Sequence, residues 1–541
     1  MQTIAGGAIS APRPWIGPAL GQWLGVAALA AGVLLAAAIA GPDASWDLRN
    51  YHLYNGYAWL NGRIGTDLDP AQMQTFLCPL LDIAYVLLLQ AFNHMPRLLA
   101  AALAVPQAIA AVLVLVLARR LLPPWQAFAA ALIGVTGVAG LSTIGTAMSE
   151  MAPAACILGA ALLLIRADAA EPSEQACLAA GLLAGLAVGL KLTFGPYALG
   201  LMAMTAIAPG RRVRRLLWFA VGALVGGGVC DGFWWWNLWS RFGDPVFPFF
   251  NDLFRSPWGE PGRMADLRFM PRSVAQALFY PLFWACTPRT LVSELPMRDP
   301  RIALGWIAIL AIMIRAAGQR RYPARGVAML STFWAVSYVA WEMCFSILRY
   351  LATLELLSGV LIMIALRPLL ARLAWEWQRI CAAALVLALV AATVYPDWGR
   401  AAPEGPAVSV ALPALPPDTL VVLLDPSPMA YLAAFAPRGV RFVGANNNLV
   451  HPGDGNLLTR QVEAAIRTYP GPLWGLEMPR ESPGIADVTL RVYGLRRGVG
   501  CAPVRSNLDQ NGILACPLRH INPKPPGPSA RYRAPHQQHS R

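Results

Sequence analysis

Long apolar segments alternate with short polar ones along most of the chain, and the alternation stops near residue 396. Apolar runs of this kind predict membrane-spanning helices, because about 20 apolar residues cross the hydrocarbon core of a bilayer. The chain is therefore expected to be a multi-span α-helical membrane protein of about 11 spans. The predicted spans are 20–40, 97–118, 124–141, 151–165, 176–190, 194–208, 214–234, 302–317, 326–346, 350–366 and 380–396.

The part of the chain after the last apolar run is more polar and predicts a separate domain. A Pro- and Ala-rich linker at 401–417 leads into it, and the pattern over 418–520 predicts a small extracytoplasmic α/β domain. The basic, Pro-rich residues 521–541 predict a disordered tail. Within the domain we expect three strands, Thr419–Leu424, Val440–Val443 and Val488–Tyr493, and one helix, Leu458–Thr468.

Composition agrees with a membrane protein and charge predicts its orientation. The 541 residues are 57% hydrophobic and only 13% charged, with a mean hydropathy of +0.49 and a net charge of +14. The arginines cluster between apolar runs, which favours a role in topology and argues against a nucleic-acid partner. Three such clusters are expected in the cytoplasm: Arg211, Arg212, Arg214 and Arg215; Arg315, Arg320, Arg321 and Arg325; Arg367, Arg372 and Arg379.

This charge rule places the N-terminus in the cytoplasm and the C-terminal domain outside a bacterial cytoplasmic (inner) membrane. The loops 42–76 and 236–300 then also lie outside. The rule holds at every loop if the apolar segment 77–93 lies at the interface or re-enters the membrane instead of spanning it. It then requires 176–190 and 194–208 to be two short spans broken at Lys191.

The nine cysteines have no metal-ligand spacing, and most lie in or beside apolar segments. Cys501 and Cys516 are the exception, because both lie in the polar domain. They are candidates for a disulfide worth roughly 3 kcal/mol. Such a bond requires an oxidising compartment.

The loop after the first span concentrates charged and aromatic residues, which is typical of a site at the membrane surface. Asp47, within WDLRNYH, is the favoured functional carboxylate, with Asp43 as a reserve. Asp47 has two structural alternatives, an ion pair with Arg49 and a helix N-cap. Asp67-Leu68-Asp69 resembles a metal-binding DxD motif but is better explained as a turn before Pro70.

Three further charged residues stand at the ends of apolar runs. Glu150 opens one run, where a helix-start carboxylate is the structural alternative. Lys191 interrupts another, where the choice lies between a snorkelling side chain and a phosphate partner. Arg349 separates two predicted spans; it is either a phosphate clamp or the partner of Glu342 or Glu355.

Three sequence patterns resemble the integral-membrane C-type glycosyltransferases over roughly residues 15–400. One is the acidic first loop, WDLRNYHLYNGYAWLNGR, and another is G-x-x-x-G-L-x-x-G-L-K-x-T, which ends at Lys191 and Thr193. The third is GDPVFP between aromatic residues, followed later by FSILRYL. The chain lacks the doubled Asp-Glu of the protein O-mannosyltransferases, so a protein acceptor is not implied.

The resemblance implies transfer of a sugar from a polyprenyl-phosphate donor to an envelope acceptor, which is a glycan, lipid or protein. Asp47 is then the expected base and Glu150 its support, while Lys191 and Arg349 hold the leaving phosphate. No cofactor is predicted and no residue is assigned to a metal, although a divalent metal stays open. The remaining residues assigned to substrate binding are Tyr350, His52 and Asn50.

Two other classes of protein share some of these features. A transporter or flippase for a lipid-linked or anionic solute also needs cations within the membrane. Such a protein is expected to contain internal repeats with paired broken helices, and the two halves of this chain show no convincing repeat. A non-catalytic partner in envelope assembly is the third class, and it would tolerate neutral side chains in place of Asp47 and Lys191 together.

Overall fold

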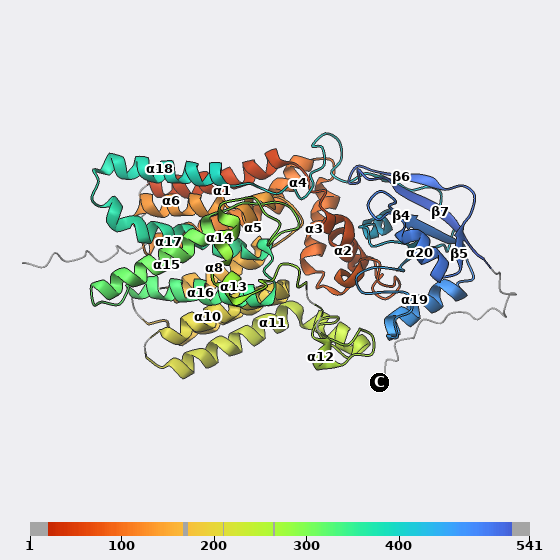
Figure 1. Ribbon diagram of the computed structural model, residues 1–541, viewed down its shortest axis with the longest axis horizontal. Coiled ribbons are helices and arrows are strands. Elements are labelled where there is room, and N and C mark those ends of the chain that lie inside the picture. The colour runs from red at the N-terminus through yellow and green to blue at the C-terminus, as the bar shows by residue number, and fades with distance from the viewer. Residues whose placement is uncertain (1–19, 166–170, 209, 263, 265, 522–541) are drawn as a thin grey trace, which may run out of the picture.

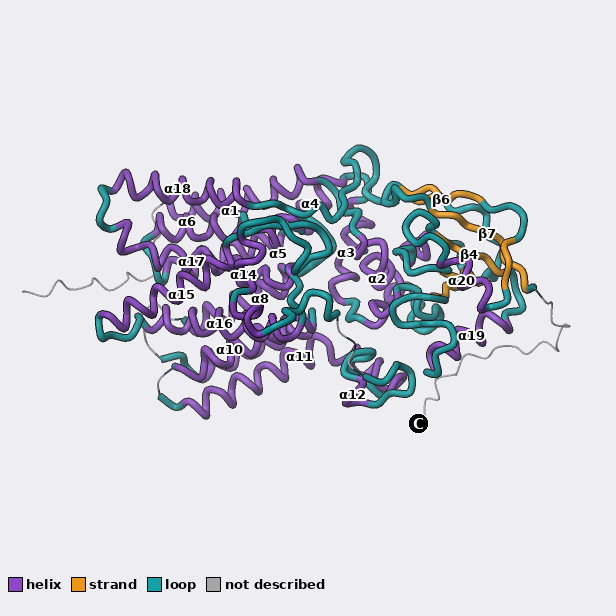
Figure 2. Tube along the Cα trace, viewed as in Figure 1, coloured by secondary structure: helices purple, strands orange, loops and turns teal. Residues whose placement is uncertain are grey.

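A computed structural model describes residues 20–165, 171–208, 210–262, 264 and 266–521. The described chain has two parts along its longest axis, a helix bundle and a smaller C-terminal domain (Figure 1). The described strands gather in the second part, whereas long helices fill the first (Figure 2). The tail predicted to be disordered lies outside the described residues from position 522 onward.

The bundle is made of helices that run along the long axis of the molecule (Figure 1). All eleven predicted spans are largely helical, with short breaks at residue 104 and at 136–137, but the spans 326–346 and 380–396 leave the helix after Cys344 and Ala392. Among the described residues, seven helical segments are long and apolar enough to cross a membrane, and five apolar helices are shorter. The bundle helices are α1 (Leu20–Ala40), α4 (Pro96–Leu103), α5 (Val105–Arg119), α6 (Pro124–Val135), α7 (Val138–Ser142), α8 (Met151–Leu164), α9 (Glu174–Leu190), η3 (Leu192–Phe194), α10 (Gly195–Ile207), α11 (Arg212–Phe242), α15 (Arg301–Gly318), α16 (Arg325–Cys344), η4 (Leu348–Leu351), α17 (Ala352–Leu370) and α18 (Trp375–Ala392).

Glycines allow two of these helices to approach closely. A Cβ atom on Gly222 or Gly226 of α11 would lie 2.1 Å from the backbone oxygen of Leu178 or Leu182 in α9. The Gly-rich run of α11 therefore serves close helix packing, which small residues permit in membrane bundles.

The three helix connections that carry the arginine clusters lie at the same end of the bundle. The connections between α10 and α11, α15 and α16, and α17 and α18 all lie at the end farthest from the C-terminal domain (Figure 1). The chain breaks at Lys191 as predicted, because α9 ends at Leu190 and α10 begins at Gly195. Lys191 consequently lies at the opposite end, called here the domain end of the bundle.

The first loop forms a helical layer between the bundle and the C-terminal domain (Figure 1). The apolar segment 77–93 belongs to this layer as α3. The loops 42–76 and 236–300 are partly helical. Their elements, with α3, are η1 (Leu48–His52), α2 (Leu53–Leu60), η2 (Gln72–Phe76), α3 (Leu80–Phe92), α12 (Asn251–Phe254), α13 (Val274–Leu278) and α14 (Tyr280–Ala285).

The C-terminal domain is built on a mixed sheet of seven strands in the order β1-β6-β7-β4-β2-β3, with β5 paired to β7. The strands β4, β2 and β3 are parallel, and β7 joins β4 in antiparallel fashion. The strands β2 and β3 and the helix α19 were predicted. The elements are β1 (Val410–Ala411), β2 (Leu420–Leu423), η5 (Ala430–Phe435), β3 (Arg441–Gly444), α19 (Leu457–Thr468), β4 (Leu473–Glu477), α20 (Ile485–Val492), β5 (Leu495–Arg497), β6 (Ala502–Ser506) and β7 (Ile513–His520).

One predicted strand is wrong. The segment Val488–Tyr493 lies mostly in the helix α20, not in a strand. Its β-branched residues suggested a strand, but the apolar side chains that it buries, beside Thr489, are those of Ala486, Leu490 and Tyr493. Their spacing of four and three residues is that of one helix face, and packing of that face decides the structure.

The first loop binds the C-terminal domain at the edge of its sheet, through backbone hydrogen bonds to β3. Leu68 forms a parallel bridge to Val443 of the edge strand β3, with N–H···O distances of 3.0 and 2.9 Å to Phe442 and Gly444. Asp67 binds Arg63 and accepts a hydrogen bond from the Phe442 amide, and Asp69 accepts one from Asn447. The Asp67–Asp69 segment is therefore a docking segment.

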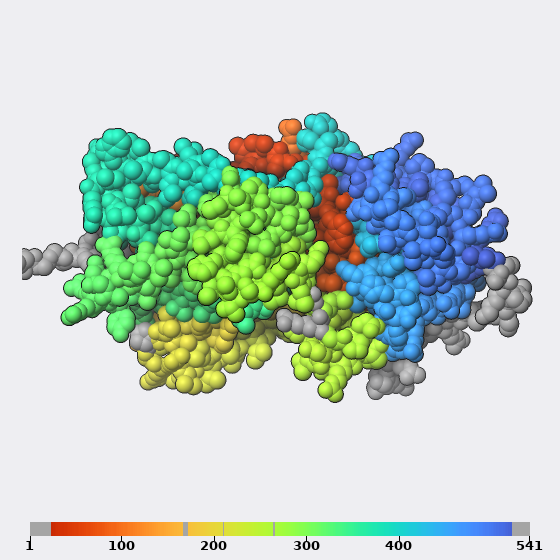
Figure 3. All heavy atoms as spheres, viewed as in Figure 1, coloured from red at the N-terminus to blue at the C-terminus, as the bar shows by residue number. Residues whose placement is uncertain are grey.

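A second contact comes from the loop 236–300. In the space-filling view this loop covers the middle of the bundle, and its first part lies beside the C-terminal domain (Figure 3). The Leu457 amide donates to the Pro257 carbonyl at 2.9 Å, and Asn456 donates to Glu260 at 2.6 Å. Loops from both halves of the bundle thus support the C-terminal domain.

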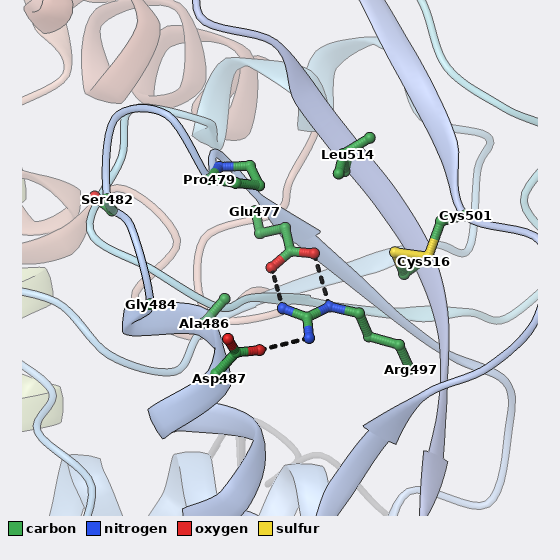
Figure 4. A pocket seen from close by; sticks show the side chains of 10 residues that line it. All are labelled: Glu477, Pro479, Ser482, Gly484, Ala486, Asp487, Arg497, Cys501, Leu514 and Cys516. Atoms are coloured by element: carbon green, nitrogen blue, oxygen red, sulfur yellow. Dashed lines mark hydrogen bonds and ion pairs between the residues drawn. A yellow bond between two sulfur atoms is a disulfide. The ribbon is translucent and has the colours of Figure 1, made fainter.

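The predicted disulfide between Cys501 and Cys516 is present in the C-terminal domain. It borders a cleft of about 310 Å³, where the Arg497 guanidinium points between Glu477 and Asp487 (Figure 4). These ion pairs and the disulfide tie β4, β5, β6, β7 and α20 together.

Candidate active site

Asp47 and Arg349 form an ion pair at the domain end of the bundle. Arg349 Nη1 donates to Asp47 Oδ2, and the Tyr51 hydroxyl reaches the same oxygen at 3.4 Å. Asp47 directly precedes η1, yet its side chain caps no helix. Neither structural alternative for Asp47 applies, because Arg49 binds Asp509 at 3.4 Å instead.

A turn in the first loop places Asp47. Asp43 accepts hydrogen bonds from the amides of Ser45, at 2.8 Å, and Ala147, at 2.9 Å. These bonds fix the chain as it leaves α1 and tie it to the segment before Glu150. Both carboxylate oxygens of Asp43, the reserve candidate, therefore accept hydrogen bonds from backbone amides.

Lys191 and Glu150 form a second ion pair, with 2.7 Å between Nζ and Oε1. Lys191 is the residue after α9, in an extended conformation that ends the helix. Glu150 immediately precedes α8, and only 2% of it is exposed. Its Oε2 is buried and has no hydrogen-bond partner within the described part of the chain. One oxygen of Glu150 therefore remains able to accept a hydrogen bond.

The two ion pairs belong to one site. Tyr350 follows Arg349 in η4, and its ring centroid lies 5.8 Å from Lys191 Nζ. The guanidinium of Arg349 also lies over the Trp398 ring at 5.4 Å. Arg349 does not pair with Glu342 or Glu355, because Glu355 instead accepts from the amides of Ala139 and Gly140 in α7. The structure thus brings Asp47, Glu150, Lys191, Arg349 and Tyr350 together.

The electrostatics of the site keep Asp47 ionised. Burial alone would raise the pKa of Asp47, but Arg349 opposes it most strongly, followed by His52 and Lys191. The net effect is a pKa below the usual 3.8. Asp47 is a carboxylate at neutral pH even though only 8% of it is exposed.

The two remaining predicted residues lie beside the ion pairs with partners of their own. His52 Nδ1 lies 2.6 Å from Asp82 Oδ1, and both side chains are buried. The Asn50 amide donates to Ala71 and Gln74 at 3.3 Å, so it packs the first loop together.

Three neighbours of the site were not predicted from the sequence: Asp82, Tyr51 and Trp398. Asp82 had a usable signal, because it is an ionisable residue within the apolar segment 77–93. Tyr51 and Trp398 had none, since aromatic residues are common at membrane surfaces. Over the described ranges, no group of three His, Cys, Asp or Glu residues is arranged to hold a metal ion.

No protein-family model matches the chain, and no curated protein matches its sequence. Two crystal structures of ArnT from Cupriavidus metallidurans are similar to it, each covering 92% of this chain and 98% of ArnT at 14% identity. The TM-scores are 0.52 for ArnT bound to undecaprenyl phosphate and 0.51 for the apo state. An oligosaccharyltransferase from Archaeoglobus fulgidus covers 87% of this chain and 72% of its own, at 14% identity and a TM-score of 0.46.

These comparisons confirm the fold class predicted from the sequence. The chain has the fold of the two ArnT structures, a multi-span helix bundle followed by a small sheet domain.

Proposed function

We propose that this protein is a membrane glycosyltransferase that moves a sugar from a polyprenyl-phosphate donor to an envelope acceptor. One observation carries the proposal: two carboxylates and two cations pair at one end of a bundle with this fold. ArnT, which has the same fold, binds undecaprenyl phosphate. A site with cations beside carboxylates suits a donor of that chemistry.

The two cations are suited to the leaving group. A phosphate leaves without a strong general acid, but its negative charge needs compensation as the bond to the sugar breaks. Arg349 offers a planar fork of donors, and Lys191 offers a compact point charge. Tyr350, the residue after Arg349, has its ring centroid 5.8 Å from Lys191 Nζ, so it is suited to contact the same donor.

The two carboxylates are suited to the acceptor. Asp47 takes the proton from the attacking hydroxyl, and Glu150 orients the acceptor or supports that base.

The proposed location is the bacterial cytoplasmic membrane, with the N-terminus in the cytoplasm and the C-terminal domain outside. The basic ends of α11, α15 and α17 lie far from that domain, as the positive-inside rule requires. The Cys501–Cys516 disulfide supports the same orientation, because disulfides persist in oxidising compartments.

Cysteine labelling tests the orientation. Cys286 is exposed in the loop 236–300, and Arg320 is exposed at the opposite end of the bundle. A membrane-impermeant maleimide is expected to label Cys286 in intact cells. In a Cys286→Ala background, Arg320→Cys is expected to react only after lysis. The reverse pattern would contradict the proposed orientation.

Lipid-linked sugars test the function. A strain without this protein is expected to accumulate a polyprenyl-phosphate sugar, and the wild-type gene is expected to remove it. Asp47→Asn should fail to do so, while Asp252→Asn, at an exposed position in α12, should succeed. An Asp47→Asn protein that inserts correctly and clears the donor fully would refute the assignment of the base.

The same experiment separates the competing transporter. A transporter would move the lipid-linked sugar across the membrane without releasing polyprenyl phosphate from it. If purified wild-type protein in vesicles transports the accumulated lipid but never cleaves the sugar–phosphate bond, the glycosyltransferase proposal is wrong.

A further inference from the structure

A buried histidine–carboxylate dyad lies beside the two ion pairs. His52 is the last residue of η1, and Asp82 belongs to the first turn of α3. Their side chains meet at 2.6 Å through Nδ1 of the imidazole, and the exposed fractions of the two residues are 2% and 4%. A carboxylate at Nδ1 selects the tautomer in which Nδ1 carries the proton, which leaves a lone pair on Nε2.

The Nε2 atom of His52 is free to use that lone pair. It is buried and has no hydrogen-bond partner in the described ranges of the chain. Buried polar atoms in proteins are normally bonded, so an unpartnered one needs an explanation. A base held by a carboxylate at one nitrogen and open at the other is the arrangement that proton transfer requires.

The π-helix η1 carries Tyr51 and His52 just after Asp47, and Tyr51 connects the two. The segment Leu48–His52 is a π-helix, a wider turn that is frequent at functional sites. The Tyr51 hydroxyl reaches Asp47, and the Tyr51 and His52 rings lie 4.0 Å apart. His52 is close enough to Asp47 that a proton on its ring would lower the pKa of that carboxyl. Three consecutive contacts thus connect Asp47, Tyr51, His52 and Asp82.

Asp47 by itself is poorly suited to keep a proton. Its pKa lies below the usual range, and Arg349 stabilises its ionised form. A proton taken from the acceptor hydroxyl therefore needs a second proton acceptor during sugar transfer. The imidazole next to it supplies one, because Asp82 stabilises the imidazolium that forms.

We propose that His52 is the terminal proton acceptor of the sugar-transfer step, with Asp82 as the residue that positions it. This inference rests on the function proposed above. The acceptor oxygen forms a bond to the anomeric carbon of the sugar, and its proton passes by way of Asp47 to His52 Nε2. The bond between the anomeric carbon and the phosphate oxygen breaks, and its electron pair leaves with the polyprenyl phosphate.

The experiment compares variants that separate packing from proton transfer. His52→Asn keeps an amide donor near the position of Nδ1 for Asp82 but has no base, and His52→Ala opens a cavity for imidazole. His94→Gln, at an exposed position after α3, is the matched control. The substrate is the lipid-linked sugar accumulated by the deletion strain, and the product measured is undecaprenyl phosphate. Binding of radiolabelled undecaprenyl phosphate is measured in parallel.

We expect His52→Asn to release product at least about 100-fold more slowly, the usual contribution of a general base. Its affinity for undecaprenyl phosphate should stay within about twofold of the wild type, a difference well under 1.4 kcal/mol. Added imidazole should restore part of the rate of His52→Ala and leave His94→Gln unchanged. Asp82→Asn should slow the reaction less than His52→Asn does, because it removes only the orienting group.

Two outcomes overturn the inference and leave the proposed function standing. One is a His52→Asn protein that reacts at the wild-type rate while Asp47→Asn is inactive. The other is a His52→Ala protein that binds undecaprenyl phosphate normally, reacts slowly and does not respond to imidazole. A wild-type protein that never releases undecaprenyl phosphate overturns the proposed function, and the inference with it.

Discussion

The ammonium of Lys191 lies 2.7 Å from Oε1 of Glu150, a residue 41 positions earlier in the chain. Each of them stands at the end of an apolar helix, where a lone charge is costly. Pairing compensates that cost for both residues. The same pairing means that neither can be replaced alone without leaving the other buried and uncompensated.

The first prediction uses this pair. Lys191→Ala should weaken binding of undecaprenyl phosphate about tenfold or more, since a charge-assisted hydrogen bond contributes roughly 1.5–3 kcal/mol. The double variant Lys191→Ala/Glu150→Ala should be more thermally stable than Lys191→Ala, because no carboxylate is then left unpaired, and should bind no better. Arg320→Ala, at the opposite end of the bundle, is the control. Equal affinities for wild type and Lys191→Ala would contradict a phosphate role for Lys191.

The second prediction concerns the shape of the cation at Arg349. Arg349→Lys keeps the charge but loses the planar fork, so sugar transfer should fall about tenfold or more while the protein stays folded. Arg349→Ala leaves Asp47 buried without its cation and should cost about 3–5 kcal/mol of stability. Transfer rate and thermal unfolding in detergent, measured together, distinguish the two variants. A fully active Arg349→Lys protein would show that charge alone suffices.

The third prediction concerns Glu355, whose carboxylate accepts hydrogen bonds from Ala139 and Gly140 at the start of α7. Glu355→Ala should leave two buried amides unsatisfied, at a cost of about 1–3 kcal/mol each. Gly137→Ala should be harmful for a related reason, because its Cβ would lie 2.0 Å from the Glu355 side chain. Thermal unfolding measures both effects. If neither variant lowers the melting temperature, the bonds to α7 contribute nothing to stability.

The fourth prediction concerns pH and the docking segment. Burial raises the pKa of Asp69 well above 3.8, and the hydrogen bond from Asn447 opposes this only in part. The folded protein then holds a proton that the unfolded chain has lost, so Asp69 makes the protein less stable as pH rises above about 3.8. Asp69→Asn should therefore raise the melting temperature at pH 7, with a difference that shrinks toward pH 4.

Asp67→Asn is the control for that prediction. Asp67 lies two residues away but is bound by Arg63 at 2.6 and 2.8 Å, so neutralising it should lower the melting temperature at pH 7. If Asp69→Asn lowers the melting temperature at pH 7, the folded state stabilises the ionised form of Asp69. That outcome would contradict the raised pKa of Asp69.

The spans and the main charged residues could be predicted because their signals are local. A charge within an apolar run is visible in the sequence, and Lys191, Glu150 and Arg349 were identified in that way. Their roles in binding and catalysis stay predictions. The partners of Asp47 and His52 could not be predicted, because Arg349 and Asp82 are 302 and 30 residues away. The helix α20 was missed because burial of Ala486, Leu490 and Tyr493 outweighed its β-branched composition.

The bridge between Leu68 and β3 has a consequence for biogenesis. The first loop is synthesised early, whereas β3 follows about 375 residues later, so the bond closes a very long loop of chain. Until it forms, the edge strand of the sheet is open to pairing with other chains. The same event that seals this edge also anchors the segment that carries Asp47. The first loop can therefore reach its final position only after β3 has been synthesised. A chain truncated before β3 lacks the hydrogen bonds that anchor this loop.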